Sequence, residues 1–84
     1  MNFVSLLGRI NGFKDSKTVL LEVARPESSN NVANLLIPCQ YWTQDEHNLL
    51  TQLKPGTRVV VRGRIDQDEK NEMFIIVEQV TIIK

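Results

Sequence analysis

Cysteine and histidine are nearly missing from this sequence, since its 84 residues include one of each, Cys39 and His47. A lone cysteine excludes an intramolecular disulfide and fits a reducing cytoplasm, and we expect its thiol to be buried and inert. His47 stands beside Asp45 and Glu46, and this spacing offers too few ligands on one face to hold a metal ion. The sequence therefore predicts no metal site and no bound cofactor.

The sequence also lacks an excess of charge, because ten lysines and arginines balance ten aspartates and glutamates. Any attraction to nucleic acid or to an anionic membrane must therefore be local. The four glycines are scattered and form no phosphate-binding loop. No serine, threonine or cysteine has an evident general base beside it, and no cleft is implied around the acidic side chains of residues 66–72. We predict no catalytic residue and hence a protein that is not an enzyme.

Long apolar runs are missing as well. No segment reaches the length of a membrane-spanning helix, and the N-terminus begins directly with a strand pattern. We expect a cytoplasmic protein without a membrane partner. A length of 84 residues fits one small domain, residues 1–84, whose limited core favours association with other copies.

What the sequence does have is the two-residue alternation of β-strands, in five segments. These segments are 3–10, 18–24, 36–42, 58–65 and 73–83. Gly63 falls on the core side of its strand, where a missing side chain favours a bend or a close backbone approach. The other residues expected to face the core are Val4, Leu6, Gly8, Ile10, Val19, Leu21, Val23, Ile37, Cys39, Tyr41, Val59, Val61 and Ile65.

The connections between the strands carry turn and helix signals. Asn-Gly at 11–12 predicts a tight turn, and Lys-Pro-Gly-Thr at 54–57 predicts a type II turn. Residues 43–46 fit a capping box, and leucines at 49, 50 and 53 form a short apolar stripe, so we expect a short helix there. Two polar loops are expected, at 25–34 and at 66–72.

Five strands with one short helix between strands 3 and 4 predict an all-β protein with an OB-fold barrel, whose curved face and loops commonly receive oligonucleotides. The chain also resembles the bacterial single-stranded DNA-binding protein family. The matching segments are Asn2 with LLGRI at 6–10, LIPCQYW at 36–42, Glu46 with LLTQL at 49–53, KPG at 54–56, VVVRGRI at 59–65, and Val77, Val80 and Ile83.

This resemblance covers nearly the whole chain. It implies non-catalytic, largely sequence-independent binding of single-stranded DNA in replication, recombination or repair. Because the sequence stops at Lys84, where the last strand ends, we expect a minimal member of the family without its acidic C-terminal tail.

Trp42 ends the third strand on the side opposite the core residues, where an outward indole can stack on a base without reading its identity. In the resembled family an aromatic residue at the matching place lies on the DNA-binding face. Basic residues on the strands and in the flanking loops can meet phosphates. The alternatives are a packing role for the indole and a solubilising role for the cations. The predicted nucleic-acid-binding residues are Trp42, Arg9, Lys14, Lys17, Arg25, Arg62 and Arg64.

Self-association is a further expectation, because members of the resembled family associate. The first strand is an edge strand with outward apolar side chains that can pair with a second copy. We expect a dimer or a tetramer that uses Phe3, Ser5 and Leu7.

Some positions depart from the family pattern. Leu36 stands where the family often has a further stacking aromatic, Glu22 lies on the expected ligand face, and residues 66–69 read Asp-Gln-Asp-Glu. With the neutral net charge, these features favour a second hypothesis. In it, the chain is an OB-fold protein-interaction subunit of a replication or primosome assembly, resembling primosomal replication protein N, with weak or no DNA binding.

Overall fold

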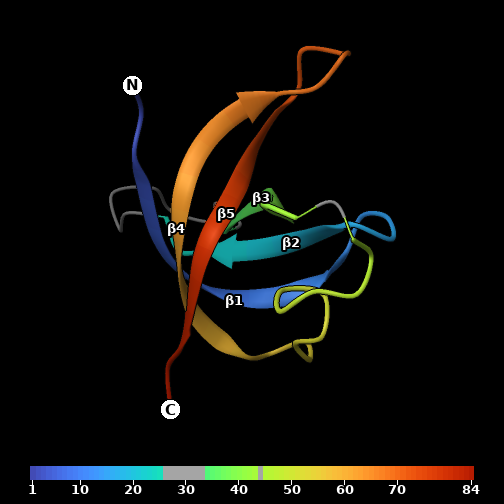
Figure 1. Ribbon diagram of the computed structural model, residues 1–84. Coiled ribbons are helices and arrows are strands. Elements are labelled where there is room, and N and C mark those ends of the chain that lie inside the picture. The colour runs from blue at the N-terminus through green and yellow to red at the C-terminus, as the bar shows by residue number, and fades with distance from the viewer. Residues whose placement is uncertain (26–33, 44) are drawn as a thin grey trace.

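The computed structural model describes residues 1–25, 34–43 and 45–84, so Gln44 and most of the predicted loop 25–34 lie outside the described residues. The described residues form five strands, arranged as Figure 1 shows. They are β1 (Val4–Phe13), β2 (Thr18–Val23), β3 (Leu35–Tyr41), β4 (Arg58–Gln67) and β5 (Met73–Ile82). All five predicted strands are therefore confirmed. In the three described ranges, no helix is long and apolar enough to cross a membrane.

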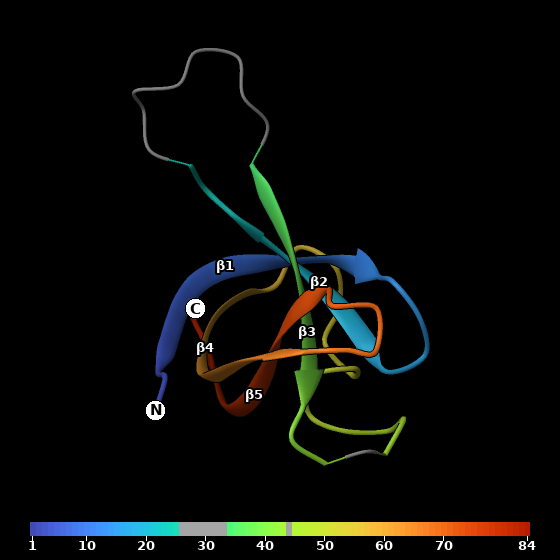
Figure 2. The same ribbon diagram turned by 90° about the horizontal axis from the view of Figure 1, so that it is seen from above.

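The strands close into a barrel in the order β1-β2-β3-β5-β4. Neighbouring strands are antiparallel except β3 and β5, which run parallel. β1 is shared between two neighbours, because Val4 to Arg9 pair with β4 and Arg9 to Phe13 pair with β2. Figure 2 shows β1 curving around one side of the barrel to reach both. The predicted five-stranded barrel is confirmed.

The barrel interior holds most of the residues that alternation assigned to the core. Ile65 is an exception, since its side chain is 42% exposed. The ladder between β1 and β4 ends at Gly63, so the rest of β4 pairs only with β5, in a hairpin that extends beyond the barrel (Figure 1). Among the described strands, none packs over the Ile65 side chain in this part of the hairpin. The buried hydrophobic residues are Ile10, Val19, Leu21, Cys39, Leu50, Val59, Val61, Ile75 and Val77.

The first hairpin turns later than the sequence predicts. β1 continues through Asn11 and Gly12, where a bulge interrupts the pairing with β2, and the chain reverses at residues 14–17. The Asp15 carboxylate closes this turn by accepting hydrogen bonds from the N–H groups of residues 17 and 18, at 2.9 and 2.8 Å. A tight Asn-Gly hairpin turn needs positive φ at both residues, and neither Asn11 nor Gly12 has it. The turn prediction at 11–12 is therefore wrong.

The predicted helix between the third and fourth strands is also wrong, because residues 45–53 form successive turns. The buried Asn48 side chain organises them. Its Oδ1 accepts hydrogen bonds from the N–H groups of Leu50 and Thr51, both at 2.9 Å, and its Nδ2 donates to the Asp45 carbonyl at 2.7 Å. This is the geometry of a helix cap, but it begins only one turn. The Gln52 N–H donates to the Asn48 carbonyl at 3.2 Å, and the Leu53 N–H already bonds to the Leu50 carbonyl, three residues back, at 3.3 Å. Leu50 still reaches the core, so the segment closes the barrel without a helix.

The turn at residues 54–57 follows the prediction. The Thr57 N–H donates to the Lys54 carbonyl at 3.1 Å, and Gly56 has a φ of 93°, as the third residue of a type II turn requires. The Gly56 N–H then donates to the Ile10 carbonyl at 2.7 Å. This bond ties the start of β4 to the middle of β1.

Candidate nucleic-acid interface

Trp42 lies directly after β3, in line with the outward residues Leu36, Pro38 and Gln40. Its indole is 57% exposed, whereas Tyr41 is half-buried against the core. The backbone N–H of Trp42 donates to the Val77 carbonyl of β5 at 2.9 Å, and this bond fixes the main chain at this point. The Tyr41 and Trp42 ring centroids lie 6.0 Å apart, so the indole has one aromatic neighbour and still presents exposed surface.

A groove of about 530 Å³ opens beside β3, between the β1–β2 turn and the loop of the β4–β5 hairpin. We call it the hairpin groove. Its charged lining consists of two lysines and four acidic residues, which leaves a formal surplus of two negative charges. Phe74 contributes an aromatic side chain that sequence reasoning missed, because strand alternation alone does not show which side chains border a groove. The lining residues are Lys14, Asp15, Gln40, Gln67, Asp68, Glu69, Lys70, Glu72 and Phe74.

The electrostatics of the hairpin groove are set by contacts within the protein. Lys14 Nζ lies 3.1 Å from Glu72 Oε2, so its charge is balanced across the groove. The backbone N–H of Lys17 lowers the pKa of Asp15, and the backbone N–H of Glu72 lowers the pKa of Asp68. Both aspartates therefore stay ionised at neutral pH. The predicted cation Lys14 thus lies in an acidic groove, and Lys17 stands in the β1–β2 turn outside its lining.

Four exposed arginines follow the outer faces of β1 and β4. Arg9 on β1 stands opposite Arg58 on β4, and Arg62 stands opposite Ser5. Arg64 lies further along β4, opposite Ile76 of β5. Arg58 is absent from the predicted site, although the alternation that placed Arg62 and Arg64 outward places it outward too. Arg25 is exposed just after β2.

The three predicted self-association residues are all exposed, with Ser5 and Leu7 on the outer face of β1 and Phe3 just before it. Phe3 and Ser5 border a shallow pocket of about 300 Å³ together with Val4 and Arg62. The structure therefore groups Arg62 with the self-association residues and Arg9 with Arg58.

Groups suited to catalysis or metal binding are sparse. Burial raises the pKa of the Cys39 thiol to about 12, so it stays protonated at neutral pH and is a poor nucleophile. His47 is exposed in the turns before β4. Within residues 1–25, 34–43 and 45–84, no group of three or more His, Cys, Asp or Glu residues is placed to hold a metal ion.

Comparison with solved structures places this barrel among known folds. No protein-family model matches the sequence, and no curated protein matches it. The N-terminal domain of PriB protein from Thermoanaerobacter tencongensis, described as dimeric, aligns with a TM-score of 0.70 and 18% identity, over 99% of this chain and 97% of that chain. Rim1, a mitochondrial single-stranded DNA-binding protein from S. cerevisiae, aligns with a TM-score of 0.65 and 16% identity, over 100% and 98%. The chain has an OB-fold.

Oligonucleotide-binding OB-folds use the face of strands 2 and 3 and the loops that join strands 1–2 and 4–5. In this OB-fold, Trp42 extends that face and the hairpin groove lies between those loops. The predicted binding residues therefore separate into an aromatic after β3, Lys14 in the acidic groove with Lys17 in the β1–β2 turn, arginines on β1 and β4, and Arg25 after β2. The structure does not gather them into one patch.

Proposed function

We propose that this protein binds single-stranded DNA, without catalysis and with little sequence preference, in DNA replication, recombination or repair. The observation that carries the proposal is the exposed Trp42 indole beside the OB-fold face, with its backbone held by a hydrogen bond to β5. Stacking on an aromatic side chain is sequence-tolerant, because every base has a π-face. Rim1, which has the same fold, is a single-stranded DNA-binding protein, and this supports the same class of ligand.

In this proposal the phosphates are bound by the arginines of β1 and β4. The hairpin groove has more carboxylates than ammonium groups, so it repels a phosphate backbone. Among the described residues, the one ion pair joins Lys14 to Glu72, which leaves Arg9 and Arg62 without a carboxylate partner there. Because few phosphates are neutralised, the affinity is moderate and depends on salt.

A titration with an unstructured deoxythymidine oligomer tests this function, since Trp42 is the sole tryptophan and reports on its own surroundings. We expect saturable quenching of its fluorescence. The logarithm of the association constant should fall linearly with the logarithm of the salt concentration, by about 0.7 per phosphate neutralised. Unchanged fluorescence, together with an unshifted oligomer in a mobility assay, would rule out single-strand binding at this face.

We also propose self-association through β1. From Val4 to Gly8 the described ladders pair β1 with β4 alone, so the other edge of this segment has unpaired backbone groups. Phe3 and Leu7 are 87% and 54% exposed beside that edge. The fold neighbour from PriB is described as dimeric, which supports a dimer.

Sedimentation velocity over a range of protein concentrations tests self-association. The parent protein should sediment as a dimer or larger, and the double variant Phe3→Ser/Leu7→Ser should sediment as a monomer, because its edge has lost its apolar contacts. Leu49→Ser removes a leucine that is 62% exposed, compared with 54% for Leu7, from the turns before β4 and serves as the matched control. A double variant that sediments like this control would refute the β1 interface.

A second candidate function is a protein-interaction subunit of a replication assembly. The acidic hairpin groove favours it, because this groove occupies the place where an oligonucleotide would enter a DNA-binding OB-fold. Phe74 adds an apolar contact for a basic partner segment. If the oligomer titration gives neither quenching nor a mobility shift, this second candidate replaces the first.

A further inference from the structure

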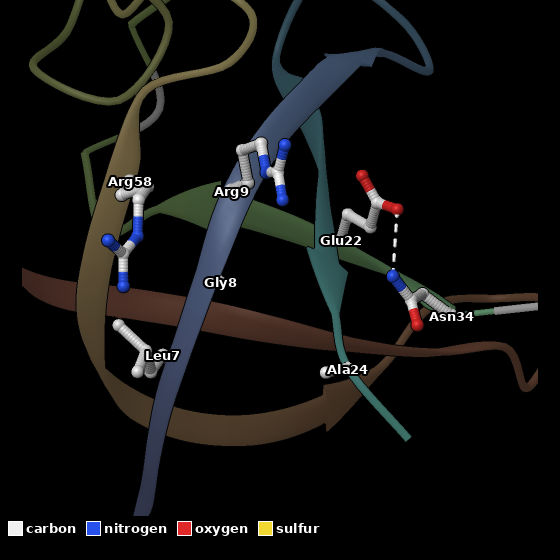
Figure 3. A pocket seen from close by; sticks show the side chains of 7 residues that line it. All are labelled: Leu7, Gly8, Arg9, Glu22, Ala24, Asn34 and Arg58. Atoms are coloured by element: carbon white, nitrogen blue, oxygen red, sulfur yellow. Dashed lines mark hydrogen bonds between the residues drawn. The ribbon is translucent and has the colours of Figure 1, made fainter. Parts of the chain in front are cut away.

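Arg9 and Arg58 form a cross-strand pair of like charges. They stand directly opposite each other in the β1–β4 ladder, and both line one pocket of about 180 Å³. In Figure 3, Arg9 on the middle strand is flanked by Arg58 on one side and by Glu22 on the other. Like charges directly opposite one another destabilise a sheet. A bound anion would remove this repulsion.

No carboxylate among the described residues pairs with these two arginines. Glu22 stands opposite Arg9 in β2, so it is the acidic residue that the register places for such a pair. Its carboxylate instead accepts a hydrogen bond from Asn34 Nδ2 at 3.0 Å, drawn as the dashed line in Figure 3. A guanidinium group has five N–H donors and no acceptor. The donors of Arg9 and Arg58 are therefore left for a ligand.

We propose that this pocket binds the phosphate of an internal phosphodiester of single-stranded DNA. The planar fork of a guanidinium group matches two phosphate oxygens at once. The proposal rests on the proposed function for the source of the phosphate, whereas the site itself rests on the paired arginines. We call it the arginine pocket, lined by Leu7, Gly8, Arg9, Glu22, Ala24, Asn34 and Arg58.

The arginine pocket carries a surplus of positive charge. Two guanidinium groups and the Glu22 carboxylate leave one positive charge. An internal phosphodiester has one negative charge and complements it. A terminal phosphate, with a charge of about −1.5 to −2 at neutral pH, is attracted as well, because the two guanidinium groups outweigh Glu22.

The arginine pocket also extends the path of the DNA beyond Trp42. Arg9, Glu22 and Leu36 are cross-strand neighbours on β1, β2 and β3. Trp42 follows Leu36 by six residues, which corresponds to about 20 Å of extended chain. At a spacing of about 3.4 Å per nucleotide, a dinucleotide covers only about 7 Å of this distance. A dinucleotide therefore cannot occupy both places at once.

Substitutions that remove one charge each distinguish binding in the pocket from a general attraction between the protein's positive charge and DNA. With a long deoxythymidine oligomer, Arg58→Gln should weaken binding by about 5- to 10-fold and reduce the salt slope by about 0.7. Lys54→Gln removes the same charge from the exposed turn before β4 and should change neither quantity appreciably. Glu22→Gln should strengthen binding. If Arg58→Gln behaves like Lys54→Gln while both keep the parent's oligomeric state, the pocket proposal is overturned.

A second measurement separates failure of the pocket from failure of the proposed function. The Nε–Hε resonances of Arg9 and Arg58 are followed by NMR in the parent protein during addition of the dinucleotide d(TpT), of thymidine, or of thymidine 5′-monophosphate. We expect both resonances to shift with d(TpT) and with the monophosphate, and to stay in place with thymidine, which has no phosphate. Stationary resonances with d(TpT) overturn the pocket even if Trp42 is quenched by the oligomer. Shifting resonances support it as a phosphate site even if Trp42 is not quenched.

Discussion

Gly63→Ala should lower the free energy of unfolding by about 3 kcal/mol or more, because the barrel has no room for a side chain there. A Cβ at this position would lie 1.8 Å from the Ile76 carbonyl oxygen and 2.8 Å from the Ile76 carbonyl carbon. These are backbone atoms of β5, so no side-chain rotation relieves the overlap and the two strands must separate. For a protein of this size, about 4–8 °C of melting temperature is lost per kcal/mol, so we expect a drop of at least about 12 °C.

Gly12→Ala is the matched control for this substitution. Gly12 also lies in a strand, but a Cβ built there meets no atom within 4 Å, and its φ is not positive. We expect this variant to be unchanged or slightly stabilised, because alanine reduces the entropy of the unfolded chain. Urea denaturation of the parent and of both variants gives the three free energies of unfolding. Similar losses in the two variants would show that the close approach of β4 and β5 does not limit stability.

Gly63 also illustrates what the sequence can predict about this fold. Alternation placed Gly63 on the core side and predicted a bend or a close backbone approach there; the structure shows Gly63 buried and the backbone of β5 close to it. Alternation succeeds because each barrel strand has one covered face and one open face. Alternation wrongly predicts that Ile65 is buried, because the pattern does not show that the pairing of β1 with β4 ends at Gly63. The helix prediction is wrong because a capping box and a leucine stripe do not show that only one turn forms, from Asn48 to Gln52, before the next turn begins at Lys54.

The exposure of a candidate site residue was predictable where it depends on the alternation within a single strand. Trp42 is exposed as its place after the third strand suggested. Contacts between distant segments were not predictable, since Lys14 meets Glu72 at a separation of 58 residues and shares a groove with Phe74. Likewise, the pairing of Arg9 with Arg58 depends on the β1–β4 register, which two separate strand patterns do not fix. Lys14, which was expected to bind phosphate, thus lies in an acidic groove, and an arginine outside the prediction completes a basic pair.

Trp42→Ala should weaken binding to a deoxythymidine oligomer by about 5- to 150-fold. The reason is that one base loses stacking worth about 1–3 kcal/mol. Trp42→Phe keeps an aromatic face and should recover much of the loss. Both variants lack the fluorescent indole, so the measurement is the anisotropy of a labelled oligomer. The salt slope should stay near that of the parent, because the substitution removes a stacking contact and no positive charge.

Leu49→Ala is the control that distinguishes stacking from a loss of exposed apolar surface. Leu49 is 62% exposed in the turns that follow Trp42, so its truncation removes a comparable side chain without a ring. The free energy of unfolding of each variant is measured alongside, because the Trp42 ring lies beside Tyr41 and its loss can loosen the core. If Trp42→Ala binds the oligomer as tightly as Leu49→Ala while Arg58→Gln binds it weakly, the DNA is bound through its phosphates alone. Single-strand binding would then rest on β1 and β4, and the indole would have no part in it.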